Sequence, residues 1–431
     1  MGDRLRVGVK LIDGNNGDEV KHAEYEYPAS DPIRVRENLV RDVGDLLRQR
    51  VGEQIQFEQW KAGTQNQEAF VFTERAQKAM NDAQELTAAS DTTGATARLH
   101  VADSLLSLSE SRDKQWIQPV ILRGNVAFRQ ARIASNPADM AKSVDNGMIS
   151  ADAAMALDSM NAGALELRGT LRYWRWLNDL IPDPKESART LRLAEEDLQK
   201  STTIDPHVAS AWSVFSSLLT NKPEPDPVGA ALAARRAYEE DAYLSAAPDI
   251  LWRLYSTAYD IEKPIEAKQW CDEGQRRFPS NPRFVQCQLW LLTLRGTKTT
   301  PAAAWSLIPS LKNITPEKDW AFESREAQML VAAGLARAGM QDSARHVLVR
   351  SRGNPQVDPS QDLVIDEAVV RVILGDTTEA LNLLKQYLVA NPDHRVGMAN
   401  TQSWWWRDIK NDPRYKQMVG SYSGSPVSAG R

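Results

Sequence analysis

The sequence has little of several features on which common protein classes depend. Its 431 residues include two cysteines, too few for a disulfide framework, and five histidines that stand apart along the chain. No apolar run approaches the roughly 20 residues that a membrane-spanning helix needs, and the N-terminus has neither the basic start nor the apolar stretch of a signal peptide. Lys and Arg number 52 against 57 Asp and Glu. This net charge of -5 argues against non-specific binding to nucleic acid, which requires a surplus of cations.

Catalytic and cofactor motifs are also missing. Gly334 and Gly339 have the spacing of a phosphate-binding loop, but Met340-Gln341 follow them where a lysine and a hydroxyl residue are required. There is no H-R-D or D-F-G motif of a kinase, and no histidine has a second histidine or a cysteine one helical turn away. Gly420 to Gly424 places Tyr422 where a nucleophile elbow needs serine. We therefore expect no enzyme activity, no metal and no cofactor.

The first 60 residues have a pattern of their own. Apolar residues alternate with others from Leu5 to Leu11, and after a Gly/Asn-rich turn a return strand is predicted for Val20 to Tyr27. Asp31-Pro32 predicts the start of a helix that runs to a stop at Gly52. A hairpin with one helix is too small to be stable alone. Unless the following helices support it, we expect residues 1–60 to be part of an α/β domain whose other strands are absent or supplied by another molecule.

Residues 61–419 carry a helical pattern. Apolar and small residues recur at helical spacing between Pro, Gly and Asn-Pro breaks, such as those at Asp205-Pro206 and Asn391-Pro392. In the clearest unit, Gly375 is predicted to end one helix and Asp376 to cap the next, which Pro392 terminates. Loosely periodic breaks of this kind predict stacked helical hairpins, so the fold class is mostly α, an α-solenoid with a short N-terminal β-hairpin and helix.

Two family resemblances follow from these residues. Ala211-Trp212, Ala267 with Trp270, and Glu379-Ala380 resemble tetratricopeptide repeats, although the spacing is looser than their 34-residue period. This resemblance implies a non-enzymatic scaffold that binds a protein or peptide. Asp3 to Asp13 and Pro32 to Leu47 resemble the end of a TolB-like domain, which often precedes such repeats in bacterial proteins.

The second resemblance extends to a larger context. The stretches that carry it are Glu166 to Trp176, Arg276 to Pro279 and Trp404 to Asp408. They are similar to the C-terminal, non-catalytic half of bacterial receptor-type serine/threonine kinases. That context implies a sensor or regulatory part of a larger signalling protein, placed outside the cytoplasm, in the periplasm or at the cell surface. A cytoplasmic location is the alternative.

Aromatic residues supply the candidate partner-binding site. The chain has 13 tryptophans, and each buries 150–250 Å² if it fills the space between helices. The alternative is that some of them line a groove for a partner, because consecutive aromatics on a helix cannot all face the core. The candidates are Tyr173, Trp174, Trp176, Trp404, Trp405 and Trp406. For the last three, a cap that closes the final repeat and an interface with another chain both remain open.

Two functions of different kinds fit this sequence. The first is a protein-protein interaction scaffold, since stacked hairpins form an extended binding surface. The second is a structural subunit that assembles head-to-tail into a ring or filament, since the two ends differ and such contacts are heterologous. A Ser/Gly-rich tail at residues 420–431 is expected to be flexible.

Overall fold

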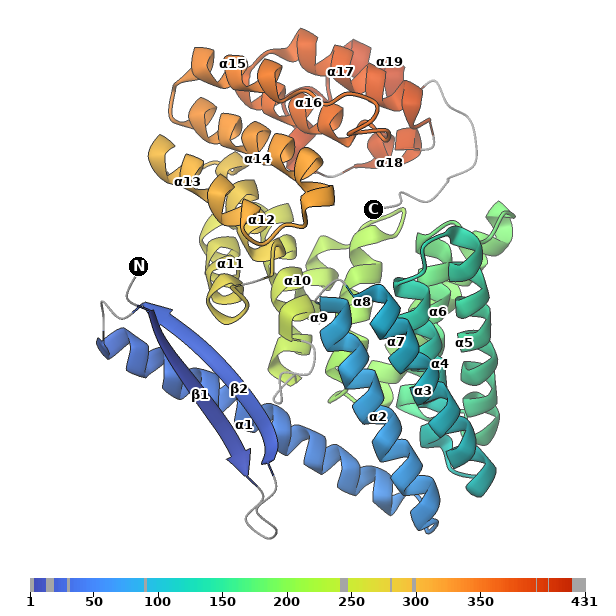
Figure 1. The fold of residues 1–431 in the computed structure, drawn as a ribbon. Coiled ribbons are helices and arrows are strands. Elements are labelled where there is room, and N and C mark those ends of the chain that lie inside the picture. The colour runs from blue at the N-terminus through green and yellow to red at the C-terminus, as the bar shows by residue number, and fades with distance from the viewer. Residues whose placement is uncertain are drawn as a thin grey trace. The chain divides into compact units, whose positions relative to one another are not determined.

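The computed structural model divides into an N-terminal unit and a helical unit. It describes residues 4–12, 19–28, 32–88, 91–240, 247–279, 281–296, 300–392, 394–401 and 403–420. The N-terminal unit comprises Met1–Gln65 with Asp241–Ser245, and the helical unit comprises Asn66–Glu240 with Ala246–Arg431 (Figure 1).

The N-terminal unit is the predicted β-hairpin followed by a helix. Strand β1 (Arg4–Ile12) pairs antiparallel with β2 (Glu19–Pro28), and Leu5 lies opposite Tyr27. Tyr27 is buried, and its hydroxyl donates a 2.6 Å hydrogen bond to the carboxylate of Asp42 on α1 (Pro32–Ala62). The alternating pattern therefore correctly predicted both strands, and Asp31-Pro32 correctly predicted the start of the helix at Pro32. The turn between the strands and Asp31 lie outside the described residues.

The predicted end of α1 at Gly52 is wrong. The helix continues through this glycine for another ten residues, to Ala62. A glycine inside a helix costs about 1 kcal/mol relative to alanine, which strong helix formers on both sides can offset. Glu53 to Ala62 contains no proline and is rich in such residues. A lone glycine without a following proline was therefore a weak stop signal.

The helical unit is a series of antiparallel helical hairpins. Its elements are α2 (Gln67–Ala88), α3 (Thr92–Arg112), α4 (Ile117–Arg132), α5 (Pro137–Leu157), α6 (Ala162–Leu177), α7 (Pro184–Ile204), α8 (Ala209–Asn221), α9 (Pro227–Glu240), α10 (Ala247–Asp260), α11 (Pro264–Arg277), α12 (Arg283–Trp290), η1 (Leu291–Thr293), α13 (Pro301–Lys312), α14 (Glu317–Arg337), α15 (Gln341–Ser351), α16 (Asp362–Leu374), α17 (Thr377–Ala390), α18 (His394–Asn400), η2 (Trp404–Trp406) and α19 (Pro413–Gly420). This is the mostly α, tetratricopeptide-like solenoid that the sequence predicted.

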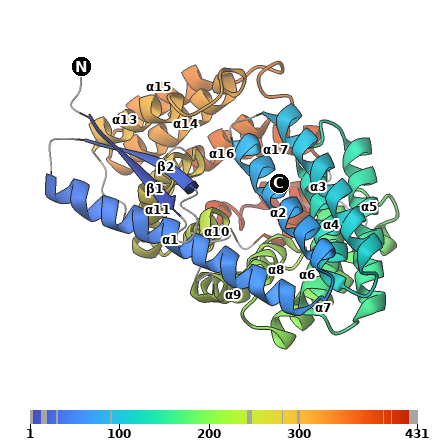
Figure 2. The ribbon, with the colours of Figure 1, turned by 60° about the horizontal axis from the view of Figure 1, so that its bottom comes forward.

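The hairpins stack so that the helices form two layers. From α4 to α16, each even-numbered helix packs on its own hairpin partner and also on the even-numbered helix of the next hairpin. The odd-numbered helices from α3 to α13 pack on their hairpin partner and on the following even-numbered helix. Closer approach within one layer makes a stack curve toward that layer. We call α4, α6, α8, α10, α12, α14 and α16 the inner layer; Figure 2 shows successive hairpins following this curve.

Helix ends follow the signals seen in the sequence. Asp158, Asp205 and Asn391 directly follow the last residues of α5, α7 and α17, so the recurring breaks mark the ends of second helices in hairpins. Gly375 ends α16 with φ 77°, a left-handed conformation that suits glycine. Asp376 does precede α17, but its side chain accepts no capping bond from that helix. Its carboxylate instead accepts from Arg345 and Arg371, which hold it away from the helix end.

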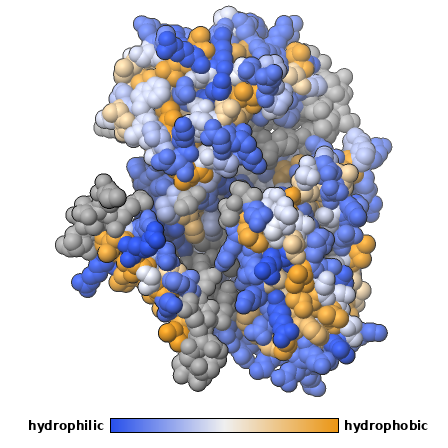
Figure 3. Space-filling view, in the orientation of Figure 1, coloured by the Kyte–Doolittle hydropathy of each residue, from blue (hydrophilic) through white to orange (hydrophobic). Residues whose placement is uncertain are grey.

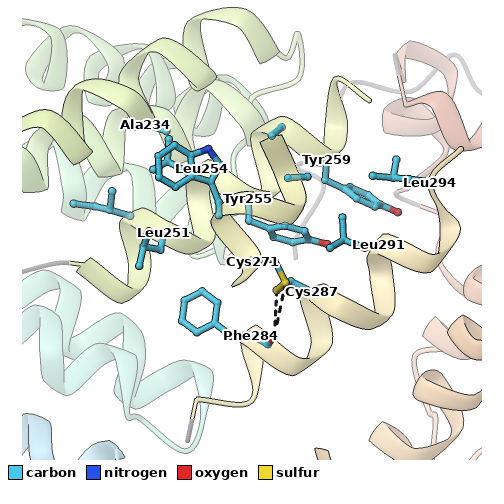
Figure 4. Packing of buried hydrophobic residues seen from close by; sticks show 14 of the residues in the cluster. Ala234, Leu251, Leu254, Tyr255, Tyr259, Cys271, Phe284, Cys287, Leu291 and Leu294 are labelled. Atoms are coloured by element: carbon cyan, nitrogen blue, oxygen red, sulfur yellow. Dashed lines mark hydrogen bonds between the residues drawn. A yellow bond between two sulfur atoms is a disulfide. The ribbon is translucent and has the colours of Figure 1, made fainter. Parts of the chain in front are cut away.

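The interior contains successive clusters along the stack. The longest apolar stretch of the sequence, Met329 to Leu335, lies in α14 and is buried against neighbouring helices of the stack, apart from Gly334. Another cluster joins α10, α11 and α12, and a disulfide between Cys271 and Cys287 lies within it (Figure 4). Among the described residues, no helix is long and apolar enough to cross a membrane.

Candidate functional site

The predicted aromatic residues of α6 are mostly part of the core. Tyr173 and Trp176 are buried and their rings stack 6.1 Å apart, whereas Trp174 is half-buried and meets Phe128 of α4 edge-on. The Tyr173 hydroxyl donates to the carbonyl of Ser217 at 3.2 Å and accepts from an amide of α8. These rings therefore join three helices of the inner layer, and of the three only Trp174 retains partial exposure. Their binding of a partner stays a prediction.

The three tryptophans near the C-terminus pack against distant parts of the same chain. Trp406 is buried among residues of α16, α17 and α19. Trp404 is buried in the cluster of α10 to α12, and Trp405 contacts both clusters. This arrangement resembles the predicted closing cap, in that the segment seals the last hairpins. It also ties them to α10, which lies more than one hundred residues earlier.

A group of charged residues that the sequence analysis did not single out lies on the inner layer. Glu166 of α6 is half-buried, and its carboxylate accepts a hydrogen bond from Ser210 of α8. Crowding by protein atoms raises the pKa of Glu166 to about 7, and the Ser210 bond lowers it only in part. A carboxylate between two neighbouring inner helices is thus close to half-protonated at neutral pH.

Arg253 and Asp260 of α10 form the second part of this group. Loss of hydration lowers the pKa of Arg253, while Tyr173 and Asp260 act in the opposite direction. Loss of hydration also raises the pKa of Asp260 to about 6, although its side chain is open to solvent. Within the described residues neither side chain forms an ion pair or a hydrogen bond.

Arg253 and Asp260 thus combine loss of hydration with side chains that still reach the solvent, Arg253 in part and Asp260 fully. We define the inner-face site as Glu166, Tyr173, Arg253 and Asp260, contributed by α6 and α10 of the inner layer. The charge of Arg253 interacts with Tyr173 and with Asp260, and Glu166 lies about two turns before Tyr173 on α6. Groups with shifted pKa values are frequent at binding sites, and two of these four, Arg253 and Asp260, also form no ion pair or hydrogen bond within the described residues. Other arginines of the inner layer differ from Arg253 in this respect; Arg168, for example, already forms an ion pair with Asp197.

The inner-face site was not visible in the sequence for a specific reason. Glu166, Arg253 and Asp260 are single charged residues in helices that contain many others. Helical spacing indicates which residues face away from the core, but it does not show which helices of different hairpins pack against each other. The sequence did indicate one residue of the site, because Tyr173 was among the aromatic candidates and its hydroxyl interacts electrostatically with Arg253.

Two other kinds of feature, clusters of metal-ligating side chains and apolar patches on the face shown in Figure 3, give no candidate site. The described residues contain no group of three or more His, Cys, Asp and Glu side chains placed to hold a metal ion. On the face shown in Figure 3, apolar side chains form separate patches between hydrophilic ones. Scattered apolar residues of this kind are normal on protein surfaces and do not indicate a binding site.

Comparisons with known proteins show a similarity in fold class alone. No protein-family model matches the sequence, and no curated protein matches it. Among solved structures, the chain is similar to the Cut9-Hcn1 hetero-tetramer of the APC/C at 13% identity, covering 80% of this chain and 76% of that one, with a TM-score of 0.35. The TPR domain of P58(IPK) is 11% identical, with 80% of this chain and 96% of that one covered and a TM-score of 0.24. Yeast Tom70 is 12% identical, with 80% of this chain and 99% of that one covered and a TM-score of 0.29. We draw no functional argument from these similarities.

Proposed function

We propose that this chain is a non-enzymatic protein-interaction scaffold whose inner-face site binds an extended segment of a partner protein. The observation that carries the proposal is Arg253, a guanidinium that is crowded by protein, open on one side and without an ion-pair partner among the described residues. A desolvated cation of this kind gains most when a carboxylate approaches it. Asp260 lies about two turns after Arg253 on α10 and offers an acceptor for a basic group of the same segment.

The chemistry of the site defines the partner segment. It carries an acidic side chain for Arg253 and, a few residues away, a basic side chain for Asp260. Such a segment also places apolar groups near Trp174, which is half-buried and contacts Phe128 at a ring separation of 5.4 Å. Hydrogen bonds to charged groups contribute about 1.5–3 kcal/mol each, enough for selective binding when two are made together.

The test uses a random peptide library panned on the immobilised full chain. The peptide retained most strongly is labelled, and its dissociation constant is measured by fluorescence anisotropy. We expect Arg253→Ala to weaken binding at least about tenfold, which corresponds to about 1.4 kcal/mol. The matched control is Arg235→Ala, because Arg235 on α9 already pairs with Glu266 and lies outside the inner layer. Failure to recover any peptide, or equal binding by both variants, would contradict the proposal.

The finer parts of the family resemblance belong to this proposal and stay predictions. A role as the sensor part of a bacterial kinase-type protein, and a TolB-like origin for the N-terminal unit, are compatible with a scaffold of this kind. Head-to-tail assembly into a ring or filament is the alternative function. Light scattering across a concentration series separates them, since a scaffold keeps a constant mass of 48.1 kDa while a self-assembling subunit grows with concentration.

A further inference from the structure

The C-terminal segment crosses the inner layer of the last hairpins. We call Ser403–Asp408 the strap. On one side Trp406, with Ile409 just beyond the strap, is buried in the cluster of α16, α17 and α19. On the other side the strap lies against α10, α12 and the residues after η1. The strap thus occupies the same layer of the stack that carries the inner-face site further along.

The aromatic contacts of the strap resemble those of a bound peptide. Trp405 stacks on Trp290 with ring centroids 5.3 Å apart and planes inclined by 9°. Its indole N–H donates a 3.0 Å hydrogen bond to the hydroxyl of Tyr259. Tyr259 also contacts the hydroxyl of Thr293 at 2.8 Å. The receiving rings are therefore positioned by their own helices.

Two ion pairs continue this contact beyond the rings. Arg407 donates two hydrogen bonds to the carboxylate of Glu262, which follows the end of α10, and one of them measures 3.2 Å. Arg295 donates to Asp408 at 2.9 Å. Glu262 has φ 54°, a left-handed conformation that costs a non-glycine residue about 1–2 kcal/mol. The backbone thus holds this carboxylate in an unusual position from which it reaches the strap.

The structure assigns a second binding site to this surface, formed by Tyr259, Trp290, Glu262 and Arg295. We propose that it binds a segment of another protein with the pattern Trp-x-Arg-Asp, and that the strap is its intramolecular occupant. The pattern is read from the strap itself, where Trp405, Arg407 and Asp408 meet complementary groups. This site goes beyond the inner-face site and does not depend on it.

The polar contacts of the strap with this surface are weak, and a competing segment must also replace the apolar contacts of Trp404 and Trp406, which are buried. The Arg407 and Asp408 side chains are 49% and 54% exposed, and ion pairs at such positions contribute about 0–1 kcal/mol. In addition, the buried indole N–H of Trp404 has no hydrogen-bond partner among the described residues. A buried donor without a partner costs about 1–3 kcal/mol. A competing segment with phenylalanine at this position avoids that cost.

The experiment uses the full chain and a labelled peptide, Ser-Phe-Trp-Trp-Arg-Asp, which copies the strap with phenylalanine in place of its first tryptophan. Fluorescence anisotropy measures its binding. Arg407→Ala weakens the intramolecular competitor and leaves the receiving surface intact, so we expect the peptide to bind several-fold more tightly than to the wild-type chain. Arg236→Ala, which removes a similarly exposed arginine paired with Glu239 on α9, is the control and should leave binding unchanged.

A charge exchange tests the site directly. Glu262→Arg should reverse the preference of the chain, so that Ser-Phe-Trp-Trp-Glu-Asp binds more tightly than the original peptide. Glu239→Arg should not reverse it. If Glu262→Arg does not fold, as judged by circular dichroism, Arg295→Glu should instead favour Ser-Phe-Trp-Trp-Arg-Arg. Absence of tighter binding to Arg407→Ala, or absence of any reversal in the variant that folds, would overturn the proposal.

Discussion

Cys271 and Cys287 are joined by a disulfide whose Cα atoms lie 6.0 Å apart, and both side chains are fully buried between α10, α11 and α12. The bond links α11, the second helix of one hairpin, to α12, the first helix of the next, across a sequence separation of 16. Figure 4 shows the pair close to the ring of Phe284. This covalent link stabilises the part of the stack to which the strap also attaches.

Reduction of this disulfide should lower the stability of the helical unit. Closing a loop of this length contributes about 3 kcal/mol, mainly by restricting the unfolded chain. The loss should be partly offset, because the carbonyl oxygen of Phe284 lies 3.2 Å from the sulfur of Cys287 and can accept a hydrogen bond from the free thiol. We expect a lower urea midpoint after refolding with dithiothreitol. The double variant C271A/C287A should not respond to dithiothreitol, and an unchanged midpoint in the wild-type chain would contradict this role.

A buried ion pair between α6 and α7 should matter more than an exposed one between α6 and α5. Arg168 donates to Asp197 at 2.7 and 2.9 Å, and the Asp197 side chain is only 4% exposed. Asp197→Ala leaves arginines without their partner in a desolvated position, so we expect a loss of about 3 kcal/mol. Asp145→Ala breaks the pair with Arg175, where the carboxylate is 57% exposed, and should cost less than about 1 kcal/mol. Equal losses in urea unfolding would contradict this difference.

Close packing at Gly274 predicts a large effect from a small substitution. A Cβ atom at this position of α11 would lie 2.1 Å from two carbons of the Phe284 ring on α12. Because the ring cannot rotate away within the core, Gly274→Ala should lower stability by about 1–3 kcal/mol or more. Gly44→Ala on α1 is the control, since its Cβ would meet no heavy atom within 4 Å. Thermal unfolding should show a lower midpoint for Gly274→Ala, whereas Gly44→Ala should not lower the midpoint, because alanine is about 1 kcal/mol more favourable than glycine inside a helix.

The parts of this fold that the sequence predicted are those specified by neighbouring residues. Alternation from Leu5 to Leu11 predicted β1, and Gly375 predicted the end of α16, because each signal involves only neighbouring residues of the chain. Contacts between distant residues were not predictable in this way. Trp405 and Tyr259 are 146 positions apart, and only the curvature of the whole stack brings them together.

The candidate site shows the same division. The helical pattern placed Tyr173 on a helix with other aromatics, but its hydrogen bonds to α8 depend on how two hairpins stack. Arg253 carried no local signal, because an arginine in a helix is usually solvated or paired along the same surface. Its lack of a partner among the described residues becomes visible only when the positions of all neighbouring carboxylates are known.

The pH dependence of stability tests the crowding at Glu166. In the folded chain its pKa is about 7, whereas its ordinary value is 4.5. Between these pH values the folded protein keeps a proton that the unfolded chain has released, so the contribution of Glu166 to stability falls as the pH rises from 4.5 to about 7 and is then constant. Glu166→Gln cannot ionise and can still accept a hydrogen bond from Ser210.

We therefore expect Glu166→Gln to differ little from wild type at pH 4.5 and to be more stable than wild type at about pH 8, as measured by urea midpoints. Glu74→Gln removes an exposed carboxylate on α2 and should change the midpoint equally at both pH values. The sign of this difference is the critical point. If the advantage of Glu166→Gln were the same at both pH values, the pKa of Glu166 would be the same in the folded and the unfolded chain. The loss of hydration by which the inner-face site is recognised would then lack its support at Glu166, while the contacts of the strap would remain as they are.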